Sequence, residues 1–259
     1  MTVTLITGAA SGFGREVARQ LVRRGEQVVL LDVNDADGQV VADELGAPYL
    51  HCDVSDYDEV LATTAKAEEI TGGIDAFFLN AGISSGFSFG PDFDLQKYRR
   101  AMGINLDGVV FGVQAALPVL QRRGGGSIVC TASMAGLTGT PFDPVYGANK
   151  HAVVGLVRAL GPALQPMGIR VNAFCPGFAE TKIIVDIKEH LQGVGVPIIP
   201  VEKAGASVLQ IFDSGATGEA WLLQAGRDVM PYAFRGIPGP LTEEGSRAGV
   251  LDPSAVPEL

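Results

Sequence analysis

The sequence contains little cysteine, histidine and charge. Its 259 residues include three cysteines and three histidines, and 19% of the side chains are charged. Cys52, Cys130 and Cys175 lie in or beside apolar runs, where reduced, buried thiols are the common outcome, and this favours a cytoplasmic location. The histidines are widely separated and away from carboxylate pairs at ligand spacing, so no metal site is expected.

Basic residues are also scarce. The 19 lysines and arginines are outnumbered by 29 acidic residues, which gives a net charge of −10, and no basic cluster is larger than a pair. Nucleic acids and anionic membranes attract proteins through larger basic patches, so neither is expected as a partner. No apolar run reaches the roughly 18 residues of a membrane span, and the first residues do not read as a signal peptide.

Apolar residues, by contrast, make up 47% of the chain, enough for the core of one α/β domain of this length. Short β-branched runs alternate with longer segments of helical period. The expected strands are 3–7, 28–31, 49–52, 76–79, 127–131, 169–174 and 220–224, and the expected helices are 13–24, 35–45, 57–71, 95–121, 145–166 and 201–212. Because the strands are apolar throughout, helices should cover both faces of the sheet. The pattern predicts an α/β, single-domain Rossmann-type fold, a doubly wound parallel sheet of about seven strands.

The domain organisation follows from where this rhythm is interrupted. Residues 1–227 form the expected dinucleotide-binding and catalytic domain, and residues 228–259 form a C-terminal tail rich in Gly, Pro and charge that packs late or frays. Within the domain, Gly193, Gly195, Pro197 and Pro200 interrupt the half-apolar segment 183–200. Such a segment is either a substrate lid or a plain surface loop.

A glycine-rich turn follows the first expected strand. Residues 7–14 read Thr-Gly-Ala-Ala-Ser-Gly-Phe-Gly and open the first helix. Glycines there permit a tight turn and a close approach of backbone N–H groups to a pyrophosphate, whose charge the helix N-terminus also favours. By itself the spacing also fits an ordinary strand-to-helix turn. The residues assigned to cofactor binding here are Gly8, Ser11, Gly12, Phe13 and Gly14.

Asp32 ends the second expected strand, about 20 residues further on. Its carboxylate can accept hydrogen bonds from the adenosine ribose hydroxyls of NAD. A 2′-phosphate would meet a like charge, and no Lys or Arg stands at Ala10, Ser11 or Val33 to compensate it. The predicted cofactor is therefore NAD, although Asp32 could also be a simple strand-end turn residue.

With these motifs, the chain resembles the short-chain dehydrogenase/reductase family from end to end, apart from the tail after about Arg227. The family's adenine-binding acid and its following turns are similar to Asp53, Val54, Asn80, Ala81 and Gly82. A later Pro-Gly turn, with a Thr that contacts the nicotinamide or pyrophosphate, looks like Pro176, Gly177 and Thr181. Four residues match the family's catalytic positions: Asn105, Ser133, Tyr146 and Lys150.

Tyr146 and Lys150 are four residues apart and share one face of a helix. Alcohol oxidation needs a base, yet a phenol has a pKa near 10, so we expect the Lys150 ammonium and the positive nicotinamide to acidify Tyr146. Lys150 would also bind the nicotinamide ribose. The resemblance implies that Ser133 holds the substrate oxygen and that Asn105 seats a water. Taken alone, Ser133 could be a turn residue and Asn105 a packing group.

Within the family, the segments around Tyr146 and Cys175 look most like the 15-hydroxyprostaglandin dehydrogenase branch. That branch has a substrate-contacting Gln where this chain has Asp143, and its lid is longer, so a prostaglandin is not the expected substrate. The candidate pocket residues are Ile83, Met134, Leu137, Phe142, Asp143, Phe178, Ile183 and Ile184. They are mainly apolar and favour a small hydrophobic secondary alcohol or ketone, although each could equally be ordinary core.

The expected activity is NAD-dependent interconversion of a secondary alcohol and its ketone, with Tyr146 as the acid/base. An alternative from another class is an NAD(H)-binding redox-sensing regulator without turnover, since a fold does not fix a function. An acyl-carrier reductase would prefer NADPH and a basic docking patch, which neither Asp32 nor the net charge supports. The family usually assembles through its long helices, here 95–121 and 145–166, so a homodimer or homotetramer is expected.

Overall fold

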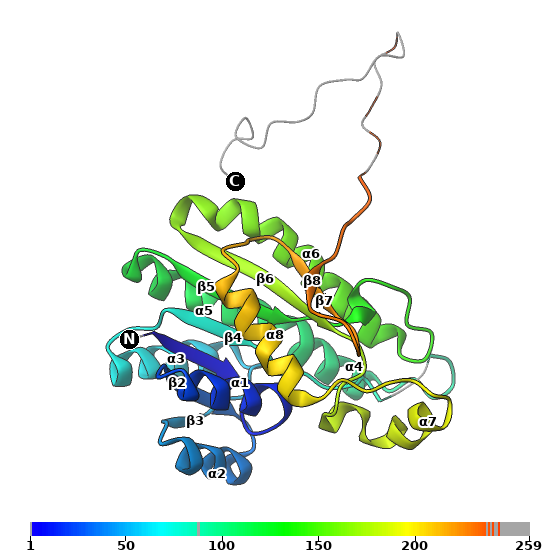
Figure 1. Ribbon diagram of the computed structural model, residues 1–259, viewed down its shortest axis with the longest axis horizontal. Coiled ribbons are helices and arrows are strands. Elements are labelled where there is room, and N and C mark those ends of the chain that lie inside the picture. Colours follow the sequence, from blue (N-terminus) through cyan, green and yellow to red (C-terminus); the bar gives the residue numbers. More distant parts are fainter. Residues whose placement is uncertain (1, 87–88, 237, 239, 241–242, 244–259) are drawn as a thin grey trace.

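Eight strands form one sheet in the computed structural model, which describes residues 2–86, 89–236, 238, 240 and 243. The strand order is β3-β2-β1-β4-β5-β6-β7-β8, and all neighbours are parallel except β7 and β8. The strands are β1 (Val3–Thr7), β2 (Gln27–Asp32), β3 (Tyr49–His51), β4 (Ala76–Leu79), β5 (Gly126–Thr131), β6 (Ile169–Pro176), β7 (Ala220–Leu223) and β8 (Met230–Pro231). The order runs outward from β1 on one side and from β4 on the other, which confirms the predicted doubly wound sheet (Figure 1).

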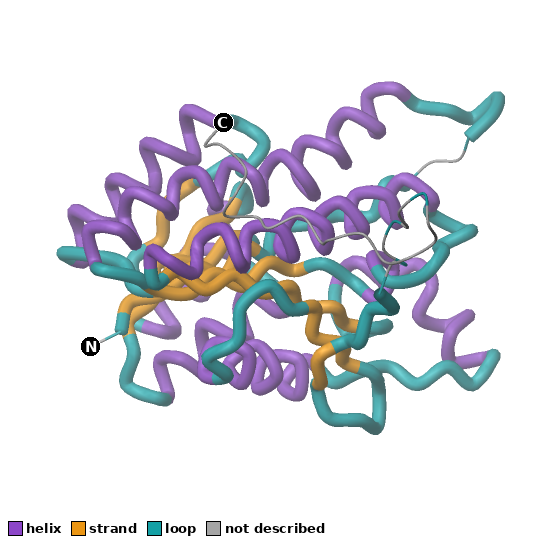
Figure 2. The backbone as a smooth tube through the Cα atoms, turned by 90° about the horizontal axis from the view of Figure 1, so that it is seen from above, coloured by secondary structure: helices purple, strands orange, loops and turns teal. Residues whose placement is uncertain are grey.

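Helices cover both faces of the sheet (Figure 2). The helices are α1 (Gly12–Arg23), α2 (Asp35–Leu45), α3 (Tyr57–Thr71), α4 (Leu95–Met102), α5 (Gly108–Arg123), α6 (Pro144–Leu164), α7 (Lys188–Gly193) and α8 (Val201–Asp213). Helices α1, α2 and α8 pack on one apolar core, and α3, α5 and α6 pack on the other. Inner strands such as β4 are buried along their whole length because both cores use their side chains.

Local chemistry sets the helix ends. Asp56 and Asp94 cap the starts of α3 and α4 by accepting hydrogen bonds from backbone N–H groups of the first turn. Gly46, Gly72 and Gly124 end α2, α3 and α5 in the left-handed conformation. These signals are local in sequence, and all predicted helix ends lie within two residues of those in the structure.

The predicted helix 95–121 is not a uniform α-helix. A π-helical turn, Gly103–Asp107, separates α4 from α5 and contains Asn105. An extra residue in a turn of this kind redirects the side chains beside it, and π-turns are frequent at functional sites. Hydrophobic period alone does not distinguish a π-turn from continuous α-helix.

The structure adds detail in two other regions. In the segment 183–200, a 3₁₀-helix, Lys182–Ile187, and α7 fill much of the length, and a role as a substrate lid stays a prediction. The start of the expected tail also packs on the sheet: β8 pairs antiparallel with β7, and the Arg158 guanidinium lies 3.8 Å from the centre of the Phe234 ring. Most of residues 237–259 lies outside the described residues.

Among the described residues, one helical stretch meets the length and hydropathy criteria of a membrane span. It covers Leu95–Arg123, with a mean hydropathy of 1.4, and half of its apolar window is buried in the fold. This stretch packs Val109, Val113 and Val119 into the apolar core that lies on the same face of the sheet as α3, α5 and α6. Core helices give the same values, so this is weak evidence for a span, and the expectation of no membrane stays a prediction.

Replacing Leu30 tests the core that supports the sheet. Leu30 in β2 is fully buried, and Leu30→Ala is expected to lower the free energy of unfolding by about 2–5 kcal/mol through lost burial and a new cavity. Leu95→Ala, the same change at an exposed position of α4, should cost less than about 0.5 kcal/mol. Denaturant unfolding of both variants measures the difference, and equal losses would contradict the packing described.

Candidate active site

A cavity of about 870 Å³ opens at the carboxyl ends of the strands. Its walls come from the segments that follow β1, β2, β3, β4, β5 and β6, as expected at the point where the strand order reverses. The predicted cofactor and catalytic residues on its wall are Gly8, Ser11, Gly12, Phe13, Asp32, Asp53, Val54, Asn80, Ala81, Gly82, Ser133, Tyr146, Lys150, Pro176, Gly177 and Thr181. Segments far apart in the sequence therefore meet at one site.

The glycine turn fits a dinucleotide. Gly8 and Gly12 have positive φ values of 66° and 52°, which side chains rarely adopt. A Cβ atom at Gly8 would lie 2.9 Å from Cα of Ala81. Ser11 precedes α1 without a capping hydrogen bond from its side chain, which leaves the first amide groups of the helix to an anionic ligand. The turn is therefore shaped for close approach of a pyrophosphate.

Gly14 has a different place from the other two glycines. It does not line the cavity, and a Cβ atom there would lie 2.2 Å from the carbonyl oxygen of Gly8. Its lack of a side chain lets α1 pack against the turn itself. Gly14 therefore supports the shape of the glycine turn without lining the cavity.

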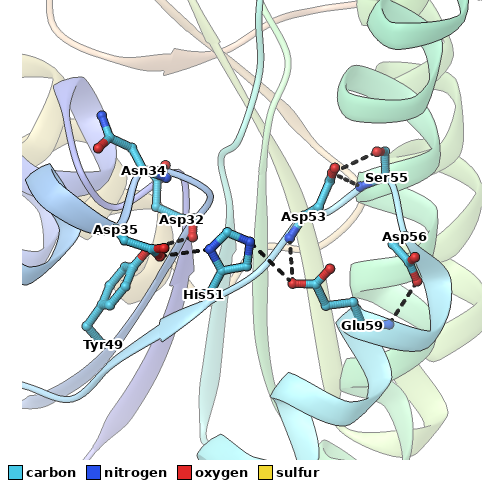
Figure 3. A network of polar contacts seen from close by, with 9 residues as sticks. All are labelled: Asp32, Asn34, Asp35, Tyr49, His51, Asp53, Ser55, Asp56 and Glu59. Atoms are coloured by element: carbon cyan, nitrogen blue, oxygen red, sulfur yellow. Dashed lines mark hydrogen bonds and ion pairs between the residues drawn. The ribbon is translucent and has the colours of Figure 1, made fainter.

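Asp32 lines the cavity at the end of β2, and Figure 3 shows its polar neighbours. One carboxylate oxygen accepts a hydrogen bond from Ala10 N at 2.9 Å and the other accepts one from Asn34 N at 3.0 Å. These two bonds fix the carboxylate at the cavity wall, and each oxygen keeps a lone pair for a ribose hydroxyl. Asp32 is therefore a turn residue in this structure, and its carboxylate could still accept hydrogen bonds from a ribose.

A polar network borders Asp32 in Figure 3. The Tyr49 hydroxyl lies 2.7 Å from the Asp32 carbonyl oxygen and 2.9 Å from an Asp35 carboxylate oxygen, so these two acceptors share its single hydrogen. His51 lies 2.7 Å from the same Asp35 carboxylate, and this hydrogen bond raises the pKa of His51. The network joins the ends of β2 and β3 and so supports the part of the cavity wall that contains Asp32.

The structure also places a lysine at the cavity wall that the sequence analysis did not select. Lys182, at the start of the 183–200 segment, lines the cavity and pairs with Asp37 at 2.9 Å. The two residues are 145 positions apart, so only the fold brings them together.

Lys150 and Tyr146 lie together at the other end of the cavity. The Lys150 ammonium is 2% exposed, lies 5.6 Å from the centre of the Tyr146 ring and donates a hydrogen bond to the Thr131 carbonyl at 2.8 Å. Burial lowers the pKa of Lys150 to about 8. It raises the pKa of Tyr146 to about 12, against a hydrogen bond with Ser133 that acts in the opposite direction. In the protein without a cofactor, burial is therefore the largest influence on the pKa of Tyr146. The expected acidification by Lys150 and the positive nicotinamide together stays a prediction.

Ser133 also has a structural part. Its hydroxyl accepts a hydrogen bond from Ala135 N at 3.1 Å and caps a short 3₁₀-helix, Met134–Gly136. Ser133 is thus a turn residue, as one of the two interpretations proposed. Its side chain also forms a hydrogen bond with Tyr146 at the cavity wall.

Asn105 does not line the cavity. It is fully buried in the π-helical turn, where its side chain accepts a hydrogen bond from Ile83 N at 2.8 Å and donates one to the Ile83 carbonyl at 2.9 Å. Nearby Gly82 needs to be small, since a Cβ atom there would lie 3.2 Å from the Asn105 side-chain oxygen and 3.5 Å from the Lys150 nitrogen. These two hydrogen bonds, which we call the Asn105 clasp, tie the π-helical turn to Ile83. The water that Asn105 is expected to bind stays a prediction.

The predicted substrate residues line the cavity with one exception. Those on the wall are Ile83, Met134, Phe142, Asp143, Phe178, Ile183 and Ile184. Leu137 is not on the wall, and its assignment to the pocket is wrong because its side chain packs against the core beneath the sheet. Phe142 is 71% exposed, and its ring centre lies 6.4 Å from that of Phe178 at the rim.

Other wall residues were missed by sequence reasoning. They include Ser84, Arg100, Ile104, Thr138, Thr140, Asp186 and Ile187. Ile187 belongs to the same half-apolar segment as Ile183 and so gave a usable signal. Arg100 lies in α4 and Ile104 in the π-helical turn, and the sequence pattern gave no sign that either lines the cavity. Among the described residues, no group of three or more His, Cys, Asp or Glu side chains is arranged to hold a metal.

Comparison with known proteins gives relatives in both sequence and structure. The chain is 37% identical over 183 residues to the 2,5-dichloro-2,5-cyclohexadiene-1,4-diol dehydrogenase of Sphingobium indicum, covering 70% of this chain and 73% of that one. It is 34% identical over 230 residues to the 3-alpha-(or 20-beta)-hydroxysteroid dehydrogenase of Mycobacterium bovis, covering 86% and 88%. These relatives do not confirm the resemblance to the 15-hydroxyprostaglandin dehydrogenase branch, which stays a prediction.

A similar solved structure is the 3-ketoacyl-(acyl-carrier-protein) reductase of Brucella melitensis complexed with NADH, with a TM-score of 0.80 and 27% identity over 87% of this chain and 98% of that one. Levodione reductase has a TM-score of 0.79 and 29% identity over 87% and 96%. A family model described as short chain dehydrogenase matches residues 2–192. The chain therefore belongs to the short-chain dehydrogenase family and is an oxidoreductase that acts on CH–OH groups or the corresponding ketones.

Proposed function

We propose that the protein is an NAD(H)-dependent dehydrogenase that interconverts a hydrophobic secondary alcohol and its ketone. The observation that carries this proposal is the buried Lys150 ammonium beside Tyr146, in the same cavity as the glycine turn and Asp32. A buried ionisable pair with strongly shifted pKa values, in a cleft with an anion-binding helix N-terminus, is characteristic of a catalytic centre.

The residues present divide the cavity into a cofactor half and a substrate half. The amide groups at the start of α1 would hold the pyrophosphate, and Asp32 would accept hydrogen bonds from the adenosine ribose. Lys150 would donate hydrogen bonds to the nicotinamide ribose from the ammonium hydrogens that Thr131 does not use. When bound, the dinucleotide supplies the hydride acceptor or donor.

Tyr146 would move the proton. In alcohol oxidation its phenolate would take the hydroxyl proton as the carbinol carbon loses a hydride, and the product would be the ketone. In reduction the phenol returns that proton to the developing alkoxide. Ser133, which already meets Tyr146, would hold the substrate oxygen in place. The cationic ring of the oxidised cofactor would favour phenolate and oppose the effect of burial on Tyr146.

The apolar wall supports a hydrophobic substrate. Phe142, Phe178 and Ile183 surround the entrance, and two relatives are named for alicyclic diol and steroid substrates. Preference for NAD is supported by Asp32 and by one similar structure with NADH, whereas the structure of actinorhodin polyketide ketoreductase, 30% identical, is with NADPH. We also propose a cytoplasmic homodimer or homotetramer, and light scattering showing a monomer at micromolar concentration would contradict the assembly.

Replacing Tyr146 tests the proposed reaction. Wild-type protein should form NADH with some member of a panel of alicyclic and steroid secondary alcohols, and Tyr146→Phe should lower kcat/KM by roughly 10²–10⁴-fold because the acid/base group is lost. Tyr232→Phe, the same change at the sheet edge, should retain wild-type activity. Equal activity of Tyr146→Phe and wild type would overturn the mechanism. NAD(H) binding without turnover of any panel member would instead favour a redox-sensing regulator.

Replacing Asp32 tests the choice of cofactor. Asp32→Ala should reduce kcat/KM for NAD by about 10–100-fold, because charge-assisted hydrogen bonds to the ribose are lost, and should leave or improve that for NADP. Asp43→Ala removes an exposed carboxylate on the same side of the sheet and should change neither value. Steady-state kinetics with both cofactors measure the ratio. A wild-type preference for NADP would contradict the assignment.

A further inference from the structure

Two side chains hold the segment 82–85, which crosses the cavity wall beside Lys150. The Asn105 side chain clasps Ile83 from the π-helical turn through the two hydrogen bonds described above. Asp143 holds Ser85 from the start of α6: its carboxylate accepts hydrogen bonds from Ser85 N at 3.0 Å and from the Ser85 hydroxyl. Ser85 is 4% exposed, so this second clasp is shielded from water.

The same carboxylate also starts the catalytic helix. Asp143 is the N-cap of α6, and one of its oxygens accepts a hydrogen bond from Tyr146 N at 3.1 Å. Both carboxylate oxygens are therefore engaged by protein donors, one by Ser85 N and the other by the Ser85 hydroxyl and Tyr146 N. Asp143 stands on the cavity wall, and the hydrogen bonds that its carboxylate accepts within the protein come from Ser85 and Tyr146.

Asp143 is also an anion that acts on Tyr146. Its charge adds to the effect of burial in raising the pKa of the phenol, as does Cys175 on β6, while the hydrogen bond from Ser133 lowers it. Lys150 faces the ring from the same helix, and Cys130 on β5 and Cys175 face Lys150. The other charged residues of the cavity wall are Asp32, Asp53, Arg100, Lys182 and Asp186.

We propose that Asp143 is a positioning residue that joins the start of the helix carrying Tyr146 to the 82–85 segment and places a carboxylate on the Tyr146 side of the cavity. This inference rests on the proposed function, because it assigns the pH range in which Tyr146 exchanges its proton. A carboxylate near a phenol makes the phenol a weaker acid. Asp143 therefore moves the pH at which alcohol oxidation becomes fast to a higher value and keeps the phenol protonated for ketone reduction.

Asp143→Asn separates the charge from the cap, because asparagine caps helices about as well as aspartate. Removing the negative charge should lower the pKa of Tyr146, so the rising limb of the oxidation rate should move by roughly one unit toward acid pH. Asp143→Ser, another neutral cap, should give the same shift. Asp143→Glu keeps the charge and should restore the wild-type limb.

Two control variants complete the test. Asp56→Asn makes the same change at the N-cap of α3 and should leave the pH profile unchanged. Asp143→Ala removes both charge and cap, so it should shift the profile and also lower the midpoint of thermal unfolding by about 2–4 °C. A profile of Asp143→Asn that coincides with those of wild type and Asp56→Asn would overturn the inference.

A second readout does not depend on turnover. Ultraviolet difference titration of each chain against its own Tyr146→Phe counterpart, in the full protein without substrate, follows ionisation of the Tyr146 phenol directly. An acid shift in Asp143→Asn supports the inference even if no substrate is turned over, in which case only the proposed function fails. An unchanged titration in an active enzyme overturns the inference and leaves the proposed function intact.

Discussion

A buried lysine ammonium is the feature on which the rest of the site depends. The Lys150 side chain reaches from α6 to the end of β5, and within the described residues the Thr131 carbonyl takes one of its three N–H donors. Burying a cation is unfavourable unless it is hydrogen bonded, so the surroundings must provide polar partners and leave space for others. Gly136 allows α6 to pack closely at this point, because a Cβ atom there would lie 2.4 Å from the Lys150 backbone carbonyl oxygen.

The neighbouring elements follow from the same constraint. The π-helical turn directs Asn105 to Ile83, and the clasp keeps Gly82 beside the Lys150 nitrogen. Ser133 caps the short 3₁₀-helix Met134–Gly136 at the cavity wall, and Asp143 caps α6, which carries Tyr146. Each of these polar side chains has hydrogen-bond partners within the protein. The segment 183–200 contributes Ile183, Ile184 and Ile187 to the cavity wall.

Much of this arrangement could be predicted from the sequence because its signals are local or periodic. The strand and helix ends follow from apolar runs, caps and glycines, and the order of the motifs around Gly8, Asp32 and Tyr146 placed them at one edge of a parallel sheet. The rest depends on contacts between distant residues. Leu137 and Ile183 read alike in sequence, yet one packs in the core and the other lines the cavity. The orientation of Asp143 toward Ser85 and the pKa of Tyr146 are set by tertiary packing and burial, which one sequence does not contain.

The most direct test of this account is the pKa of Lys150 in the intact protein. Side-chain nitrogen NMR of protein with labelled lysines, assigned with Lys150→Arg, follows the ammonium through its titration. The account predicts a pKa of about 8 in the absence of ligand, because burial disfavours the charged form. A pKa at the ordinary lysine value near 10.4 would show a hydrated ammonium and contradict the buried centre from which the mechanism is derived.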